Sequence, residues 1–226
     1  MSKFFTSSIG QKFFMSITGV FLILFLMVHL TLNSLLLFGD GELFNKAATF
    51  MGANPLMKII EPILAIGFII HIFYATFITL KNQYARPIKY KKIDRRQSTS
   101  LASRNMYILG ALLFIFLVLH LSNFFWKIKF GTIETITYDG TEFHNIYAMV
   151  SGLFIKYLWY DIFYIIGATL LGFHLSHGFW SAFQTIGFNN DIWIIRLKFI
   201  ANIFAIIIAA GFSIIPIYFF VTNNLL

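Results

Sequence analysis

Residues 105–126 read NMYILGALLFIFLVLHLSNFFW, an apolar run without a charged side chain that contains one histidine, His120. A helix needs about 20 mainly apolar residues to cross the hydrocarbon core of a bilayer. The sequence therefore predicts an all-α integral membrane protein with five transmembrane helices, because four more uncharged runs of comparable or greater length follow the same pattern. These runs occupy residues 13–38, 62–80, 162–190 and 199–226.

The composition of the chain agrees with this fold class. Of its 226 residues, 58% are hydrophobic and only 12% are charged, whereas soluble domains carry about 25% charged residues. Because cysteine is absent, disulfides, thiolate-bound iron–sulfur clusters and covalently attached c-type haem are excluded. We expect a single membrane domain over residues 1–226, with helices at about 11–38, 56–81, 103–127, 157–185 and 192–222, an inner basic loop at 82–102 and an outer loop at 128–156.

The net charge of +8 is distributed unevenly along the chain. If the five spans alternate in direction, most lysines and arginines fall on one side and most acidic residues on the other. Cytoplasmic loops carry the excess of Lys and Arg, so we expect the N-terminus in the cytoplasm and the C-terminus outside. This pattern favours a topology signal over a nucleic-acid partner. Two interpretations of the basic segment 82–104 stay open, namely topology anchoring and docking to a partner protein or to anionic lipid headgroups.

Four histidines lie inside the predicted spans and pair by depth, His29 with His120 and His71 with His174. Ionisable side chains within a membrane are costly and mark functional sites. The first pair is expected near the outer face, whereas each member of the second pair lies about 15 Å from the inner end of its helix at ~1.5 Å per residue. Two imidazoles at one depth are suited to be the axial ligands of a b-type haem iron. The pattern predicts two haems stacked across the membrane.

An internal repeat relates the first and third helices at an offset of 91 residues. In both helices a glycine precedes the histidine by ten residues, as Gly19 precedes His29 and Gly110 precedes His120. Glycines within membrane helices admit either a porphyrin or a neighbouring helix. Both interpretations stay open for Gly19 and Gly110.

Further polar residues are expected near the inner face. His177 follows His174 by three residues and shares its helix face, so on periodicity alone either could be the ligand, and the other would bind a haem propionate or a quinone. Charged and polar groups at the starts of the first and fifth helices are candidates for neutralising propionates or binding a quinone carbonyl, although flanking charges also snorkel to the interface without such a role. These candidates are Gln11, Ser16, Thr18, Arg196 and Lys198.

Three motifs together resemble the five-helix, di-haem cytochrome b subunit of the succinate dehydrogenase and fumarate reductase family. They are His29-Leu-Thr-Leu-Asn33, His120-Leu-Ser-Asn-Phe-Phe-Trp126 and His174-Leu-Ser-His-Gly178-Phe-Trp180. The resemblance implies a four-helix bundle around two haems with a fifth helix beside it. It also implies that His71 and His174 bind the proximal haem iron, and that His29 and His120 bind the distal one.

The same resemblance implies partners and a substrate for electrons. A flavoprotein subunit with FAD would carry the dicarboxylate chemistry, an iron–sulfur subunit would relay electrons, and this chain would anchor both in membrane lipid and exchange electrons with a quinone, expected to be menaquinone. A multi-pass protein of a bacterial inner membrane, and a possible dimer of heterotrimers, are implied too. Candidates for a distal quinone site are Asn33, Glu61 and Ser122, for which helix capping and loop solvation are equally good interpretations.

The chain departs from the family pattern at Gly172, where some fumarate-reducing members carry an acid in the fourth helix. Two alternatives to this family stay open. One is a two-haem cytochrome b of another membrane oxidoreductase, of the hydrogenase or formate dehydrogenase type. The other is a transporter, which predicts histidines converging at one depth rather than two. The sequence does not decide between succinate oxidation and fumarate reduction.

Overall fold

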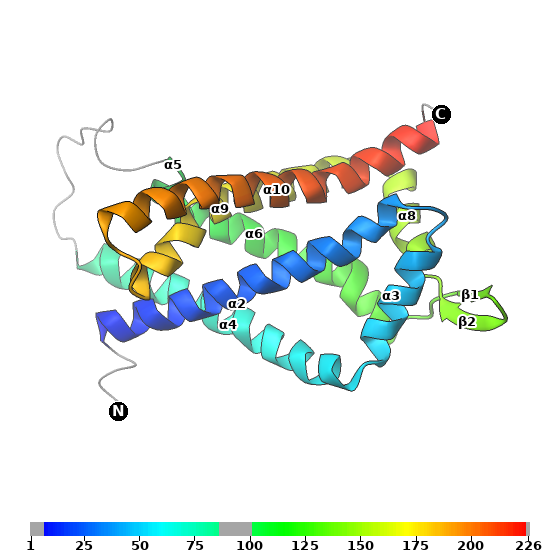
Figure 1. Cartoon of the computed structure of the whole chain (residues 1–226), viewed down its shortest axis with the longest axis horizontal. Coiled ribbons are helices and arrows are strands. Elements are labelled where there is room, and N and C mark those ends of the chain that lie inside the picture. Colours follow the sequence, from blue (N-terminus) through cyan, green and yellow to red (C-terminus); the bar gives the residue numbers. More distant parts are fainter. Residues whose placement is uncertain (1–6, 86–100, 225–226) are drawn as a thin grey trace.

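The computed structural model of the chain describes residues 7–85 and 101–224. Within these residues, five helical segments are long and apolar enough to cross a membrane, which confirms the predicted number of spans. They run alternately in opposite directions, so the start of the first helix and the turn between the fourth and fifth lie at one end of the molecule, and the end of the fifth helix lies at the other (Figure 1). The segments are α2 (Ser8–Ser34), α4 (Pro55–Tyr84), α6 (Met106–His120) with its continuation, α9 (Leu158–Thr185) and α10 (Asp191–Asn224).

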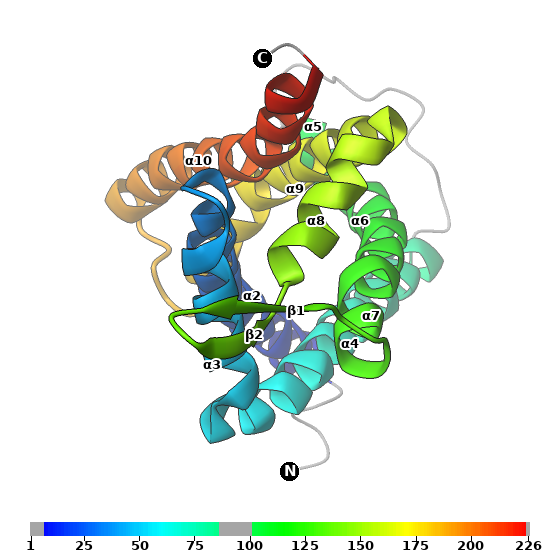
Figure 2. The same ribbon diagram turned by 90° about the vertical axis from the view of Figure 1, so that its right-hand side faces the viewer.

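The long helices pack side by side, with α2 against α4 and α9, and α6 against α9 (Figure 2). Helix α10 lies along α9 and also contacts α2. Small residues permit this close approach: a Cβ atom at Gly172 would lie 2.9 Å from the Cβ atom of Ala209, and one at Gly211 would lie 2.8 Å from a methyl group of Leu30. Gly172, which departs from the family pattern, therefore serves the contact between α9 and α10.

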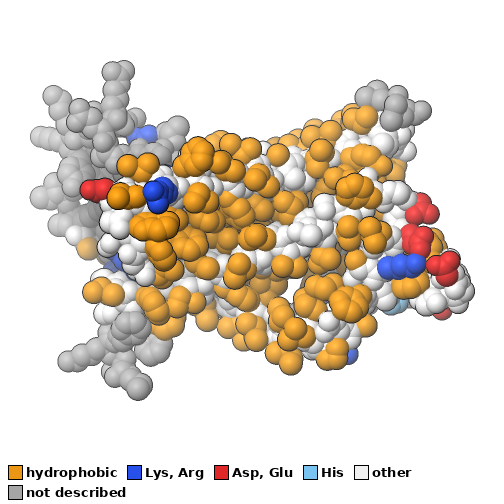
Figure 3. Space-filling model, viewed as in Figure 1, with side chains coloured by type: hydrophobic (Ala, Val, Ile, Leu, Met, Phe, Trp, Pro, Cys, Tyr) orange, Lys and Arg blue, Asp and Glu red, His pale blue; other side chains and the backbone are white. Residues whose placement is uncertain are grey.

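Apolar side chains cover the outside of the long helices. Ile69 of α4 is 66% exposed and Ile195 of α10 is 71% exposed, and the space-filling view shows hydrophobic groups over most of the visible middle of the molecule (Figure 3). A monomeric protein in water rarely exposes so large an apolar surface. Such a surface suits helices that face lipid. A helix can lie in lipid because it satisfies its backbone polar groups internally.

The end that carries the C-terminus, called the carboxy-terminal end below, contains several short elements. They are α3 (Glu42–Ala53), the antiparallel strands β1 (Thr135–Tyr138) and β2 (Thr141–His144), and α8 (Ile146–Lys156). Residues 128–156 are expected from the sequence as an outer loop whose apolar part, residues 143–155, forms a lid or an interfacial helix. Helix α8 confirms a helix there, whereas α3 and the hairpin were not predicted. The hairpin turns at Asp139 and Gly140, both with positive φ, and an Asp-Gly dipeptide is a strong signal for such a two-residue turn. The signal was present in the sequence.

Helix α6 does not continue regularly after His120. One π-helical turn, η2 (Leu121–Phe125), follows it and leads into α7 (Trp126–Phe130). Such turns inside helices occur often at functional sites. At the opposite end, α4 continues to Tyr84 and the short helix α5 (Leu101–Arg104) precedes α6. Most of the expected inner basic loop, residues 86–100, lies outside the described residues.

The main apolar core lies at the carboxy-terminal end. It combines Leu36 at the end of α2, Phe44 of α3, Phe154 of α8, Tyr164 of α9 and Phe219 of α10. A smaller cluster, formed by Ile23, Leu175, Ala205 and Ile208, joins α2, α9 and α10 near the middle of the molecule. The short elements thus close one end of the helix group around the first turns of α9.

Candidate functional site

The four intramembrane histidines form two pairs, each built by two helices. The ring centroids of His29 on α2 and His120 on α6 are 5.8 Å apart, with the rings nearly perpendicular at 88°. The ring centroids of His71 on α4 and His174 on α9 are 6.4 Å apart, at 67°. These are the partners that depth along the sequence had suggested.

The two glycines of the internal repeat lie opposite the second pair. A Cβ atom at Gly19 would lie 3.7 Å from the Cε1 atom of His71, and one at Gly110 would lie 3.7 Å from the Cε1 atom of His174. Each glycine precedes the histidine of its own helix by ten residues, which is a rise of about 15 Å. Each of these two helices therefore carries a histidine of the first pair and, ten residues earlier, a small residue that lies beside the second pair.

Aromatic rings pack against the pair formed by His29 and His120. Phe25 stacks on His29 at a centroid distance of 5.2 Å, and Phe116 stacks on His120 at 5.7 Å. Both phenylalanines stand four residues before their histidine, at the same offset of 91 residues. Neither phenylalanine was predicted as a site residue, although the internal repeat contained the signal.

Polar side chains approach the imidazoles of α2 and α4. The hydroxyl of Thr18 lies 3.3 Å from Nδ1 of His71 and donates its own proton to the carbonyl oxygen of Phe14 at 2.8 Å. Its lone pairs are then free to accept a proton from Nδ1, and in that tautomer Nε2 of His71 is the unprotonated nitrogen that could bind a metal. At His29 the neighbour is a donor instead, because the amide nitrogen of Asn33 lies 3.4 Å from Nδ1 of His29. The Nδ1 atoms of His120 and His174 are buried without a hydrogen-bond partner among the described residues.

This donor set fits haem better than a bare metal ion. No group of three or more His, Cys, Asp or Glu side chains that could hold a metal ion occurs in the described part of the chain, and protein sites for transition metals generally use three or four such ligands. A haem brings four equatorial nitrogens and needs only two axial ligands. Imidazoles bound on opposite sides of one metal ion, each at about 2 Å, have centroids roughly 6 Å apart, as both pairs do.

The other predicted residues lie at the end of the molecule where α2 and α10 begin, called the amino-terminal end below. Gln11, Ser16 and Thr18 are buried on α2, and Thr18 alone has a recorded contact with a paired histidine. His177 packs its ring against Trp180 at 4.9 Å, and the ammonium group of Lys198 lies 4.8 Å from the Trp180 ring. Arg196 points elsewhere, with its guanidinium 5.7 Å from the ring of Trp193. Because the ring of His177 packs against Trp180, it is His174 of α9 that faces His71.

The three quinone candidates do not form one group. Asn33 donates a hydrogen bond to the carbonyl oxygen of His29 at 2.7 Å, Ser122 donates one to the carbonyl oxygen of Val118 at 2.8 Å, and Glu61 forms an ion pair with Lys129 at 2.8 Å. Only Asn33 is recorded beside a paired histidine.

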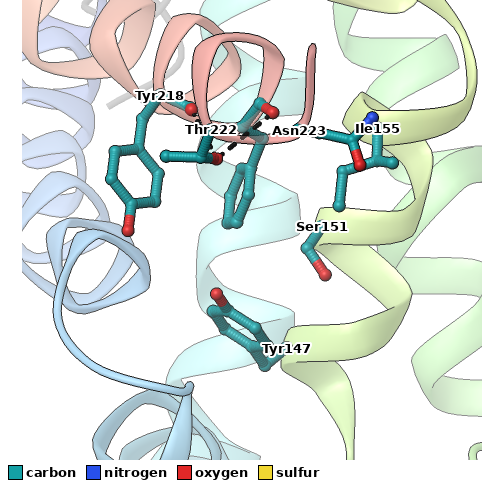
Figure 4. A pocket seen from close by; sticks show the side chains of 7 residues that line it. Tyr147, Ser151, Ile155, Tyr218, Thr222 and Asn223 are labelled. Atoms are coloured by element: carbon teal, nitrogen blue, oxygen red, sulfur yellow. Dashed lines mark hydrogen bonds between the residues drawn. The ribbon is translucent and has the colours of Figure 1, made fainter. Parts of the chain in front are cut away.

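A separate cavity of about 310 Å³ lies between α8 and the end of α10 and opens at the surface (Figure 4). It is lined by Tyr147, Ser151, Ile155, Tyr218, Phe219, Thr222 and Asn223.

Two features of the carboxy-terminal end were not anticipated from the sequence. Asp161, in the first turn of α9, is only 3% exposed, and neither carboxylate oxygen has a hydrogen-bond partner among the described residues. Asn123 of the π-helical turn lies between two tyrosines of α9: its amide is 3.5 Å from the hydroxyl of Tyr164, and its carbonyl accepts from Tyr160 at 3.4 Å. The position of Asp161 inside the predicted fourth helix was the available signal.

Comparison of the chain with protein-family models, with curated proteins and with solved structures found no match.

Proposed function

We propose that the chain is a transmembrane cytochrome b that carries electrons between two b haems. The observation that carries the proposal is the pair of facing imidazoles, repeated twice on four helices, with no further protein ligand recorded beside either pair in the described residues. Iron with two axial histidines undergoes one-electron reduction and oxidation without an open coordination position. Electron transfer, rather than oxygen binding, is the chemistry of such a centre.

Within this class, we propose the cytochrome b subunit of a succinate:quinone oxidoreductase, of the succinate dehydrogenase and fumarate reductase family. The support is the set of three histidine motifs together with five membrane-length helices. FAD-containing and iron–sulfur subunits would bind at the amino-terminal end, and a quinone, expected to be menaquinone, would exchange electrons within the membrane. The dicarboxylate reaction would take place on the flavoprotein partner.

The residues of this chain have distinct parts in the proposed function. His71 and His174 would hold the haem nearer to the partner subunits, while His29 and His120 would hold the other. Thr18 orients the ring of His71 and fixes its tautomer. Aromatic side chains around His120 exclude water from the second centre, because they surround its ring on several sides.

A reduced-minus-oxidised spectrum of membranes enriched in the protein, with haem quantified per chain, tests the class. We expect two b haems per chain, and one or fewer in His120→Ala or in His71→Ala. His144→Ala is the matched control, since His144 is exposed on the hairpin and no second histidine faces it. Wild-type protein without haem would overturn the proposal and favour a transporter.

Purification under mild detergent tests the particular family. We expect a flavoprotein and an iron–sulfur protein to co-purify, and succinate to reduce the haems of the intact complex. Co-purification of a nickel–iron or molybdenum subunit would instead place the chain with the hydrogenase or formate dehydrogenase cytochromes.

A further inference from the structure

Asp161 is an acid buried in an apolar layer without a partner. Among the described residues, no lysine, arginine or histidine forms an ion pair with it, and no donor hydrogen-bonds to it. A buried carboxylate in such surroundings is costly when charged, and an ionisable residue within a membrane domain marks a functional site by default. The charged carboxylate therefore needs a compensating positive charge nearby, such as the oxidised haem iron of the proposed function would supply, and without that charge the neutral, protonated form is favoured.

The face of α9 that carries Asp161 points toward α10. Buried residues recur along α9 every three or four positions, from Asp161 through Tyr164, Ala168 and Gly172 to Leu175. Gly172 in this stripe approaches Ala205 and Ala209 of α10. Since the two helices run in opposite directions, Asp161 lies at the level of the last turns of α10, and Pro216 is buried in that part of α10. Proline has no N–H, so the carbonyl of Phe212 receives no hydrogen bond from this position.

Asp161 is linked to the pair formed by His29 and His120 through Tyr164. Tyr164 stands one turn further along the same stripe, and its ring centroid lies 6.0 Å from that of His120. Phe154 of α8 contacts the same tyrosine ring at 5.2 Å. In a low-dielectric layer, a charge added at the histidine pair acts strongly on a carboxyl group one helical turn beyond this tyrosine.

Asp161 lies near the carboxy-terminal end of the molecule rather than in its middle. Asp161 belongs to the first turn of α9, next to exposed aromatic side chains at Tyr157 and Trp159 that are typical of a membrane interface. The cavity between α8 and α10 opens at the same end and is lined by the hydroxyls of Ser151 and Tyr218 (Figure 4). Proton exchange between Asp161 and the aqueous phase therefore does not require passage across the membrane.

Other titratable groups at this end are of two kinds. Four tyrosines come from the elements around Asp161: Tyr147 of α8, Tyr160 and Tyr164 of α9, and Tyr218 of α10. The second kind is the set of charged side chains on the neighbouring helices, the loops and the hairpin, all of which are exposed or half-buried. They are Asp40, Glu42, Lys46, Lys58, Glu61, Lys127, Lys129, Glu134, Asp139, Glu142 and Lys156. Asp161 is thus the buried carboxyl group among the described residues of this end.

We propose that Asp161 takes up a proton when the haem held by His29 and His120 is reduced, and releases it on oxidation. One electron reaches the iron and one proton from the adjacent aqueous phase binds a carboxylate oxygen of Asp161, so the net charge of the buried layer is unchanged. The proposal rests on the proposed function, because the electron is carried by the haem.

The test is a redox titration of both haems at several pH values, with the haem that disappears in His120→Ala assigned to the His29 and His120 pair. In wild-type protein we expect the midpoint potential of this haem to fall as the pH rises. In Asp161→Asn that dependence should be lost, and in Asp161→Glu it should be retained. Glu134→Gln is the control, since Glu134 is an exposed acid at the same end.

Infrared difference spectra of the wild-type protein provide a second readout, which remains useful if Asp161→Asn folds poorly. Reduction should produce the carbonyl band of a protonated carboxylic acid, and this band should shift in Asp161→Glu. A pH dependence unchanged in Asp161→Asn, or reduction without any carboxylic acid band, would overturn the inference and leave the proposed function intact. Wild-type protein that binds no haem would instead overturn both.

Discussion

Thr18 is the residue through which α2 acts on His71 of the neighbouring helix α4. Its hydroxyl spends its proton on the carbonyl oxygen of Phe14, so it can only accept from the imidazole. Loss of such a partner typically lowers metal affinity about 10- to 100-fold. We expect Thr18→Val to retain one haem firmly and to lose the other on dilution or on competition with free imidazole, as measured by haem per chain.

Thr169→Val is the matched control for this prediction. Thr169 makes the same hydrogen bond to the carbonyl four residues earlier, at 2.8 Å, but is exposed and has no recorded contact with a histidine. Equal haem retention in the two variants would show that the contact between Thr18 and His71 does not support the ligand.

Gly110 makes a second prediction at the residue scale. A methyl group at this position would lie 3.7 Å from the Cε1 atom of His174, which is ordinary contact, but a leucine side chain would extend into the space beside the imidazole. We expect Gly110→Leu to lose the haem assigned to His71 and His174 while keeping the other. Haem quantification with spectra of each centre measures this. Gly152→Leu, in open space on α8, should keep both haems.

Asn45 joins three separate elements of the carboxy-terminal end. Its fully buried side chain donates to the hydroxyl of Tyr138 on β1 and to the carbonyl of Asn145, and it accepts from the N–H of Tyr147 at the start of α8. Removing one partner leaves buried polar groups unsatisfied, at a cost of about 1–3 kcal/mol each. We expect Asn45→Ala to lower the thermal unfolding temperature in detergent.

The exposed Asn189, at the opposite end, provides the comparison for this element-scale prediction. Asn189→Ala should leave the unfolding temperature nearly unchanged. An equal effect of the two substitutions would show that Asn45 does not hold α3, the hairpin and α8 together.

The link between α3 and the hairpin also has an electrostatic part. Lys46 pairs with Glu42 on its own helix and with Asp139 in the hairpin turn, and the hydrogen bond that Lys46 donates to Glu42 is the main reason why the pKa of Lys46 is raised. A raised lysine pKa contributes stability that is fully present below the ordinary value of about 10.4 and is lost as the pH rises through the folded-state value.

We therefore expect Lys46→Met to change the unfolding temperature slightly near neutral pH, and the difference from wild type to vanish at strongly alkaline pH. Because the pair is exposed, salt should reduce the difference as well. A difference that persists in alkaline solution would assign the effect to packing of the side chain rather than to its charge.

At the scale of the whole molecule, the sequence was most informative where membrane physics leaves few choices. An uncharged apolar segment of about 20 residues crosses lipid as a helix. The depth of each histidine then follows from the fixed rise per residue of a helix. The same rules say nothing about rotation around the helix axis. Hence the facing of His174 rather than His177 toward His71, and the burial of Asp161, became visible only in three dimensions.

Helix α3 and the hairpin were not predicted, for a different reason. Helix α3, the hairpin and α8 are held by contacts between residues far apart in the chain, such as Asn45 with Asn145, and local composition does not contain these contacts. The resulting asymmetry matters for orientation. All described acidic groups except Asp191 lie at the carboxy-terminal end, whereas Lys12, Lys81, Arg104, Arg196 and Lys198 lie at the other.

This asymmetry predicts that the amino-terminal end faces the cytoplasm, by the positive-inside rule. The absence of cysteine allows a direct test with single introduced thiols. Thr141→Cys, exposed on the hairpin, should react with a membrane-impermeant thiol reagent applied to intact cells, whereas Asn189→Cys, exposed in the turn between α9 and α10, should react only after the membrane is permeabilised. The reverse pattern would put the hairpin in the cytoplasm and would move the proposed docking of the flavoprotein and iron–sulfur subunits to the acidic end, where His29, His120 and Asp161 would lie nearest to them.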